Sequence, residues 1–239
     1  MSGHSKWSTI KRKKGAADAK RGIIFTRLSK DITLAAKHAG GNIDMNPSLR
    51  LAIKKAKTSN MPAANIERAI KKGTGELPGI KYEDHEYEGY GPNSVAILIE
   101  VMTDNKNRTY PEIRNIMTKN GGNLGETGCV NWMFERKGII TIKIDNIEEN
   151  KLMQLMEHVD IEDIVFDEGF YEIIVKSEDF EKINKIFNDQ NINFDGEISL
   201  VPQNTVELLE QDADKVIKLL ELLDEHDDVQ KVHSNFEIV

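Results

Sequence analysis

The chain has 239 residues, of which 39% are hydrophobic and 30% charged, and its single cysteine excludes an intramolecular disulfide framework and fits a reducing compartment. No apolar run approaches the roughly 18 residues of a membrane span, and the basic start lacks the apolar stretch of a secretory signal. Residues 1–75 hold 17 Lys and Arg against 4 Asp and Glu, and the remainder holds 15 against 36. A first third with a net charge of +13 joined to a remainder of −21 predicts that the chain approaches a polyanion with its N-terminal end.

The first 39 residues are predicted to form a basic arm followed by a helix. The arm covers residues 1–17 and contains four consecutive cations at 11–14. Over residues 18–39, Ile24, Leu28 and Ile32 fall on one arc at about 100° per residue, which is typical of a helix with one apolar face. The roughly opposite arc carries Lys20, Arg27, Lys30 and Lys37.

Two more short helices are predicted before residue 75. Asn46-Pro47 is a start signal, because Asn is a favoured N-cap and Pro is favoured at the first helical position. The third helix is expected to begin near Asn60, with Pro62 in its first turn, and to end just before Gly73. The glycines and prolines of residues 73–79 then predict a linker.

The acidic remainder alternates between strand and helix patterns. We expect a strand at 94–103, a helix at 108–120, a glycine-rich turn at 121–128 and a strand at 132–134. Residues 138–201 follow the order βαββαβ, the pattern of a ferredoxin-like fold. After Pro202, a strand, a helix and a strand are expected at 205–209, 212–223 and 229–236.

The predicted fold class is therefore α+β, with an N-terminal three-helix basic domain followed by two α/β sandwich domains, one inserted in the other. The two leftover βαβ segments are each too small to close a core, so we expect them to pair into one sandwich. The predicted domains are a basic helical domain at 1–79, an α/β domain formed by 80–137 plus 202–239, and an inserted βαββαβ domain at 138–201.

The density and segregation of positive charge make the N-terminal domain the candidate nucleic-acid-binding region. Trp7, in the arm, is expected either to stack on a base or ribose or to anchor the arm on the helical core. The candidate binding residues are Lys6, Trp7, Lys11, Arg12, Lys13, Lys14, Lys20, Arg21, Arg27, Lys30, Lys54, Lys55, Lys57, Lys71 and Lys72.

Three other patterns point away from catalysis. The glycines of 121–128 lack the Gly-Lys-Ser/Thr ending of a phosphate-binding loop, so a bulged turn is expected there. In the segment 103–109, Asp104, Asn105 or Asn107 is expected to cap the next helix. The alternative is a partner-contact surface formed by Asp104, Asn105 and Arg108. The six histidines and Cys129 show no metal-ligand spacing, and no nucleophile motif is present. These patterns favour neither a catalytic nor a metal site.

Eight stretches of the sequence also resemble the YebC family. The stretches are GHSKW at 3–7, AKRGIIFTRL at 19–28, LRLAIKKAKTSNMP at 49–62, NIERAIKKGTGE at 65–76, YEGYGP at 87–92, TDNKNRT at 103–109, GGNLGETG at 121–128 and VNWMFERKG at 130–138. The resemblance covers essentially the whole chain and is densest in residues 1–138.

The resemblance implies a helical N-terminal domain, two α/β domains and a non-enzymatic role in gene expression with no metal and no cofactor. Bacterial members are described as probable transcriptional regulatory proteins, and mitochondrial relatives as translational activators of cytochrome c oxidase. We therefore expect a cytoplasmic, DNA-binding transcriptional regulator, with a ribosome- or RNA-binding translation factor as the alternative. Expected partners are DNA, or ribosomal RNA in the alternative, and a basic protein for the acidic body; no membrane is expected, and a monomer fits the sequence.

Overall fold

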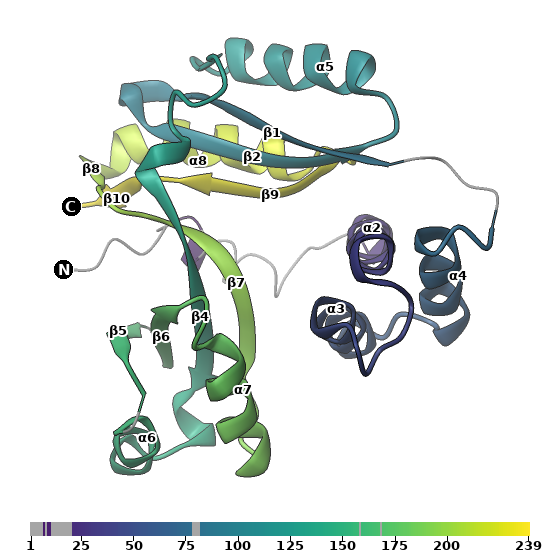
Figure 1. Cartoon of the computed structure of the whole chain (residues 1–239). Helices are drawn as coiled ribbons and strands as arrows, with labels where there is room; N and C mark the ends of the chain where they lie inside the picture. Colours follow the sequence, from purple (N-terminus) through teal and green to yellow (C-terminus); the bar gives the residue numbers. More distant parts are fainter. Residues whose placement is uncertain (1–6, 8, 11–20, 78–81, 158, 168) are drawn as a thin grey trace. The chain divides into compact units, whose positions relative to one another are not determined.

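A computed structural model describes residues 7, 9–10, 21–77, 82–157, 159–167 and 169–239 (Figure 1). The chain divides into two compact units, one running from Trp132 to Thr205 and the other comprising Lys6–Asn131 and Val206–Val239. Helices and antiparallel sheets occur together, which confirms the α+β class. The domain boundaries at 79, 137 and 201, and the insertion of one domain in another, stay predictions.

Three helices surround a small apolar core in the first part of the larger unit (Figure 1). Ile32, Leu49 and Ala56 are fully buried there. The N-cap predicted from Asn46 is confirmed, since its side chain accepts a hydrogen bond from the Leu49 amide at 3.0 Å. The helices are α2 (Arg21–Ala39), α3 (Pro47–Thr58) and α4 (Ala63–Gly73). Residues 18–20, predicted to begin the first helix, lie outside the described residues.

The second part of this unit is a four-stranded sheet with the order β3-β1-β2-β9. All of its pairings are antiparallel, and β2 joins the C-terminal strand β9 with Ile99 opposite Val232. The strands are β1 (Glu83–Tyr90), β2 (Ala96–Thr103), β3 (Asn123–Leu124) and β9 (Val229–Ser234), and a separate parallel pair is formed by β8 (Val206–Leu208) and β10 (Phe236–Ile238).

Two helices, α5 (Lys106–Lys119) and α8 (Glu210–Asp224), cover one face of this sheet. Alternate residues of β2, among them Ile97 and Ile99, point to that face because side chains alternate along a strand. They pack against Ile113 of α5 and Leu219 of α8, all fully buried. The face of α5 that does not pack on the sheet is therefore left for solvent or a partner.

The smaller unit has the strand order β5-β6-β4-β7, with every pairing antiparallel. Fully buried Phe180 packs against the sheet where Gly138 and Gly196 lie. A Cβ atom at Gly138 would approach the Phe180 ring to 2.9 Å, so a larger residue would force the helix away. The elements are β4 (Phe134–Lys143), α6 (Glu149–Met156), β5 (Ile161–Asp167), β6 (Phe170–Lys176), α7 (Phe180–Asp189) and β7 (Asp195–Pro202).

Several elements differ from what the sequence predicted. The strand β1 was not predicted, because its sequence EDHEYEGY is polar and only half-buried. The strand predicted at 132–134 begins only at Phe134, after a short 3-10 turn at Asn131–Met133. The strand predicted at 205–209 is the three-residue β8, which pairs with β10 and not with the main sheet.

Candidate nucleic-acid interface

Exposed cations line one face of α3. Arg50, Lys54 and Lys57 stand at i, i+4 and i+7, which places them on the same side of the helix, and all three are exposed. The opposite side carries Leu49 and Ile53, which are buried in the helical core. Lys55, next in the chain to Lys54, is half-buried. The amphipathic pattern thus turns the positive charge of α3 outward.

The next helix, α4, adds two exposed cations, Arg68 and Lys72, one turn apart. Ile66 and Ala69 are buried on its other side. Lys71 is half-buried, and its ammonium donates to a carboxylate oxygen of Glu67 at 2.7 Å. This hydrogen bond raises the pKa of Lys71 and lowers that of Glu67. Sequence reasoning missed Arg68, although its spacing of four from Lys72 on the polar arc was a readable signal.

Lys30, predicted to bind nucleic acid, is instead buried, and its ammonium group is fully hydrogen-bonded within the protein. Only 5% of the residue is exposed. Its Nζ donates to Asp228 Oδ1 at 3.0 Å, to the Asp227 carbonyl at 2.7 Å and to the Met102 carbonyl at 3.1 Å. Three acceptors satisfy all three protons of the ammonium. The prediction for Lys30 is therefore wrong, because contact with a phosphate would require removing the charge from its buried site.

Asp228 joins this lysine to the first turn of α5. Its Oδ2 accepts hydrogen bonds from Arg108 and Thr109, each at 2.7 Å, and from Thr103 at 3.1 Å. Burial raises the pKa of this carboxyl, but the bonds from Thr109, Arg108 and Lys30 outweigh burial and hold the pKa far below its usual range. Asp228 is therefore ionised and links α2 to the sheet and to α5.

In the segment 103–109, the structure shows the capping role that the sequence left open. The Asn105 side chain caps α5 by accepting from the Arg108 amide at 3.2 Å. The Arg108 guanidinium binds Asp104 at 3.0 Å as well as Asp228. Capping and internal pairing thus involve all three predicted residues, and a contact of this segment with a separate protein stays a prediction.

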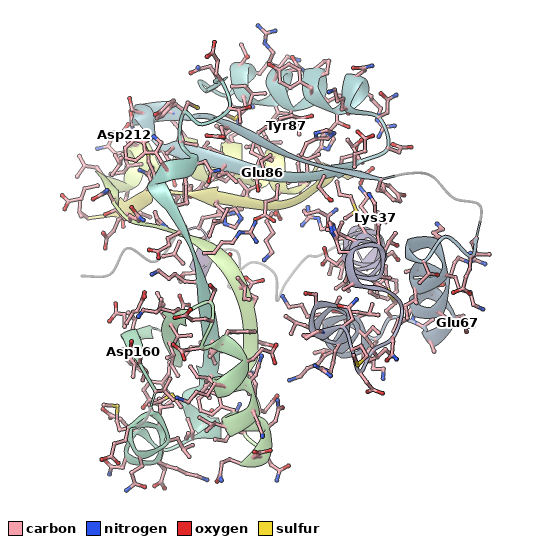
Figure 2. All side chains as sticks on the ribbon, viewed as in Figure 1. Lys37, Glu67, Glu86, Tyr87, Asp160 and Asp212 are labelled. Carbon is pink, nitrogen blue, oxygen red and sulfur yellow. The ribbon has the colours of Figure 1, made fainter. Side chains whose placement is uncertain are left out.

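Other cations of α2 also serve the fold. Arg27 forms an ion pair with Asp224 at 3.2 Å, and both side chains are largely buried. Lys37, labelled in Figure 2, donates to the Tyr82 carbonyl at 2.9 Å. Arg27 is therefore a weaker candidate for phosphate contact than its position in the sequence suggested.

Trp7 is 4% exposed and belongs to the apolar cluster that contains Ile97, Leu219 and Phe236. A ring so fully covered cannot stack on a base without leaving this core. The anchoring alternative holds, but the anchor is the α/β core and not the helical core that the sequence suggested. The candidates Lys6, Lys11, Arg12, Lys13, Lys14 and Lys20 lie outside the described residues, as does the side chain of Arg21.

The glycine-rich loop is organised by a buried carboxylate. Glu88, 3% exposed, accepts hydrogen bonds from the amides of Gly128, Val130 and Asn131 at 2.7, 2.8 and 2.8 Å. Burial raises the pKa of Glu88, but these three bonds outweigh burial and lower it. The carboxylate occupies the amides that a phosphate would need, so the loop at this point is a structural turn, as expected.

The described part of the chain holds neither a metal cluster nor a membrane-spanning helix. Within it, no group of three or more His, Cys, Asp and Glu side chains is placed to hold a metal ion. No helix among the same residues combines the length and apolar character needed to cross a membrane.

Known protein families match nearly the whole chain. Residues 5–76 match the TACO1/YebC protein N-terminal domain, and residues 82–236 match the TACO1/YebC second and third domain. A relative from Natranaerobius thermophilus, named a probable transcriptional regulatory protein, is 51% identical and covers 100% of this chain and 97% of its own length. A relative from Desulfotalea psychrophila with the same kind of name is 52% identical over 100% of this chain and 96% of its own.

A solved structure is similar as well. The crystal structure of a conserved hypothetical protein, Aq1575 from Aquifex aeolicus, matches with a TM-score of 0.85 and 43% sequence identity. The match covers 93% of this chain and 92% of that one.

Proposed function

Because the chain belongs to the TACO1/YebC family, we propose that it is a non-enzymatic regulator of gene expression that binds nucleic acid through its helical N-terminal part. The observation that carries the proposal is the set of exposed cations on two neighbouring helices: Arg50, Lys54, Lys57, Arg68 and Lys72. Exposed cations attract a phosphate backbone because each contact releases condensed counterions.

The chemistry of these two helices favours contact with phosphates over reading of bases. Their exposed positions carry mainly Lys and Arg, which bind phosphate oxygens without sequence information. Asn and Gln, which pair with adenine in the major groove, are represented only by Asn65 within α3 and α4. The helical part is therefore proposed to supply affinity, and its specificity to come from other contacts or from the shape of the target.

Duplex DNA is the first candidate target. The relatives compared above are named probable transcriptional regulatory proteins, and that naming supports a role in transcription. The acidic charge of residues 76–239 opposes close contact of this part with naked DNA. The proposed regulator therefore approaches a promoter with its helical part.

Ribosomal RNA is the second candidate. Backbone contact alone suits structured RNA as well as duplex DNA, because both present dense phosphate. The net charge of −21 beyond residue 75 is also suited to basic ribosomal proteins. These two observations favour a translation factor as the alternative.

The deciding experiment is a competition at physiological salt between a promoter duplex, a scrambled duplex and ribosomal subunits. A transcriptional regulator should prefer its promoter to scrambled DNA by about a thousandfold or more. Equal binding to both duplexes with tighter, saturable binding to ribosomes would establish the translation factor.

The interface itself is tested with the full chain carrying Arg50→Gln, Lys57→Gln, Arg68→Gln and Lys72→Gln. The slope of log K against log salt on duplex DNA should become shallower by about 3 to 4, since each phosphate contact contributes about 0.9. The matched control removes four exposed lysines elsewhere: Lys143→Gln, Lys151→Gln, Lys185→Gln and Lys218→Gln. Equal weakening by both variants would show that net charge, and not this interface, determines binding.

A further inference from the structure

The helix α5 is a basic element within the acidic part of the chain. It contains four cations and one carboxylate, whereas residues 76–239 as a whole carry a net charge of −21. Arg108 is held by Asp228, and Glu112 meets His226 at 3.0 Å. Lys106, Arg114 and Lys119 are exposed and form no ion pair with a described residue. Their charge is therefore available to a partner.

An aromatic ring lies between two of these cations. Tyr110 is 40% exposed although it sits in a helix that packs on the sheet. Since Lys106, Tyr110 and Arg114 stand at i, i+4 and i+8, they share one side of α5 and follow each other at about 6 Å along its axis. A cation, a ring and a cation thus form a short row on the surface of the helix.

The ring of Tyr110 is supported from the sheet below. It meets Tyr87 of β1 edge-on, with ring centroids 5.4 Å apart and an angle of 71°. Tyr87 in turn stacks on His85 at 6.2 Å, with the two rings nearly parallel. Figure 2 shows Tyr87 on the α5 side of β1. Burial raises the pKa of Tyr87, so its phenol stays neutral beside Tyr110.

The first turn of α5 is fixed as well. Thr109 is fully buried and bonds to Asp228, and Asn105 caps the helix directly before it. Fixing both the helix and the ring lowers the entropy that a ligand would otherwise have to remove on binding. The exposed row is therefore presented in a defined geometry.

We propose that this face of α5 is a contact site for single-stranded nucleic acid, in which an unpaired base stacks on Tyr110 and the flanking phosphates meet Lys106 and Arg114. The proposal rests on the proposed nucleic-acid-binding function and adds a second contact to it. Proteins that bind single-stranded nucleic acid combine aromatic side chains with cations, because every unpaired base has a free π-face on which a ring can stack. A duplex keeps its bases stacked inside, and an acidic protein would use the cations but would not require the ring.

The ring is tested by comparing Tyr110→Leu with Tyr110→Phe in the full chain. A labelled oligouridine, its DNA counterpart and a duplex are titrated, and binding is followed by fluorescence anisotropy. Tyr110→Leu should weaken single-strand binding by about 5- to 150-fold, the equivalent of the loss of one stacked base. Tyr110→Phe should retain it, because phenylalanine keeps the π-face, and duplex binding should change little in either variant. The RNA and DNA arms show which sugar the site accepts.

The cations are tested with Lys106→Gln and Arg114→Gln together, which also serves if Tyr110→Leu fails to fold. The salt slope on the single strand should become shallower by about 1.4, at about 0.7 for each contact. The control is the pair Lys151→Gln and Lys185→Gln, with the same charge change in α6 and α7.

Three results would overturn the site on α5. The first is single-strand binding that is unchanged in both α5 variants. The second is a loss of affinity in Tyr110→Leu that is equal for duplex and single strand. The third is displacement of the oligonucleotide by poly-glutamate as effectively as by RNA. If binding persists in the α5 variants but is lost when the cations of α3 and α4 are removed, only this site fails. If the unmodified chain binds no nucleic acid, the proposed function fails with it.

Discussion

The cations of α2 and those of α3 and α4 look alike in the sequence but differ in the structure. Lys30 and Arg27 of α2 are paired with Asp228 and Asp224, while Arg50 of α3 and Arg68 of α4 are exposed. Both groups contribute to the same basic first third of the chain. The comparison teaches that local charge density does not distinguish a cation that binds a partner from one that holds the fold together.

The difference arises from what each helix face meets. The polar face of α2 meets the end of α8 and the residues just before β9, where Asp224, Asp227 and Asp228 supply oxygen atoms. On α4, by contrast, the half-buried Lys71 pairs with Glu67 of the same helix, and Arg68 and Lys72 are exposed. Acidic residues near the C-terminus thus neutralise some of the cations in the basic first third of the chain.

The largest effect on stability is expected from Asp228→Ala, which removes the carboxylate that pairs with the buried cation Lys30. Lys30 would remain buried without its carboxylate, and removing one partner of a buried pair costs about 3–5 kcal/mol. Urea unfolding of the full chain, followed by tryptophan fluorescence, measures the loss, since Trp7 is buried in the folded chain while Trp132 is already exposed. A stability change like that of an exposed site would show that Lys30 is not held as the structure describes.

A smaller loss is expected from Glu88→Gln, which tests a buried charge satisfied by backbone amides. The glutamine can accept fewer hydrogen bonds than the three that Glu88 accepts now, and its NH₂ group would face amide donors. We expect a loss of about 1–3 kcal/mol, the range for an unsatisfied buried polar group. Hydrogen exchange of the Gly128, Val130 and Asn131 amides should accelerate in the variant, and unchanged exchange rates would contradict the proposed role of the carboxylate.

The same two carboxylates predict a dependence of stability on pH. The folded-state pKa values of Glu88 and Asp228 are lowered from ordinary values of 4.5 and 3.8, so their stabilisation is complete above those values. It is lost progressively as the pH falls below about 4.5 toward the lowered values. Unfolding free energies measured between pH 7 and pH 3 should fall less steeply in Glu88→Gln than in the unmodified chain. Parallel curves would mean that the pKa of Glu88 is not lowered.

The smallest effect on stability is expected from the exposed side of the comparison. Arg50→Gln, Lys57→Gln, Arg68→Gln and Lys72→Gln should each change the unfolding free energy by no more than about 0.5 kcal/mol, because these residues are exposed. The same variants are those expected to weaken nucleic-acid binding. A stability loss as large as that of Asp228→Ala would place them with Lys30, among the cations that hold the fold together.

Local signals predicted much of the fold and part of the candidate site. The cap at Asn46, the end of α4 at Gly73 and the α+β class follow from residues close together in the sequence, whereas α4 begins at Ala63 and not near Asn60 as expected. The strand β1 escaped prediction because its residues are mostly polar, and its place in the sheet depends on pairing with β2 and β3. Hydrophobic periodicity carries little information about such a strand.

The roles of single charged residues depended on contacts far apart in the sequence. Lys30 and Asp228 are separated by 198 residues, so no local pattern could show that this lysine is buried. Tyr110 lies four residues from both Lys106 and Arg114, but only the contact with Tyr87 shows that its ring is supported. Arg68 was different, because its position on the polar arc of α4 was visible in the sequence.

The pairing of β2 with β9 also bears on the order in which the chain folds during synthesis. The sheet of the larger unit stays incomplete until Val229–Ser234 has left the ribosome, because β9 pairs with a strand made more than a hundred residues earlier. The strands of the smaller unit, from Phe134 to Pro202, are contiguous in the chain and emerge before that. On a growing chain, β2 must therefore wait with one edge unpaired while the smaller unit closes, and a nascent protein halted before residue 229 would expose that edge to aggregation.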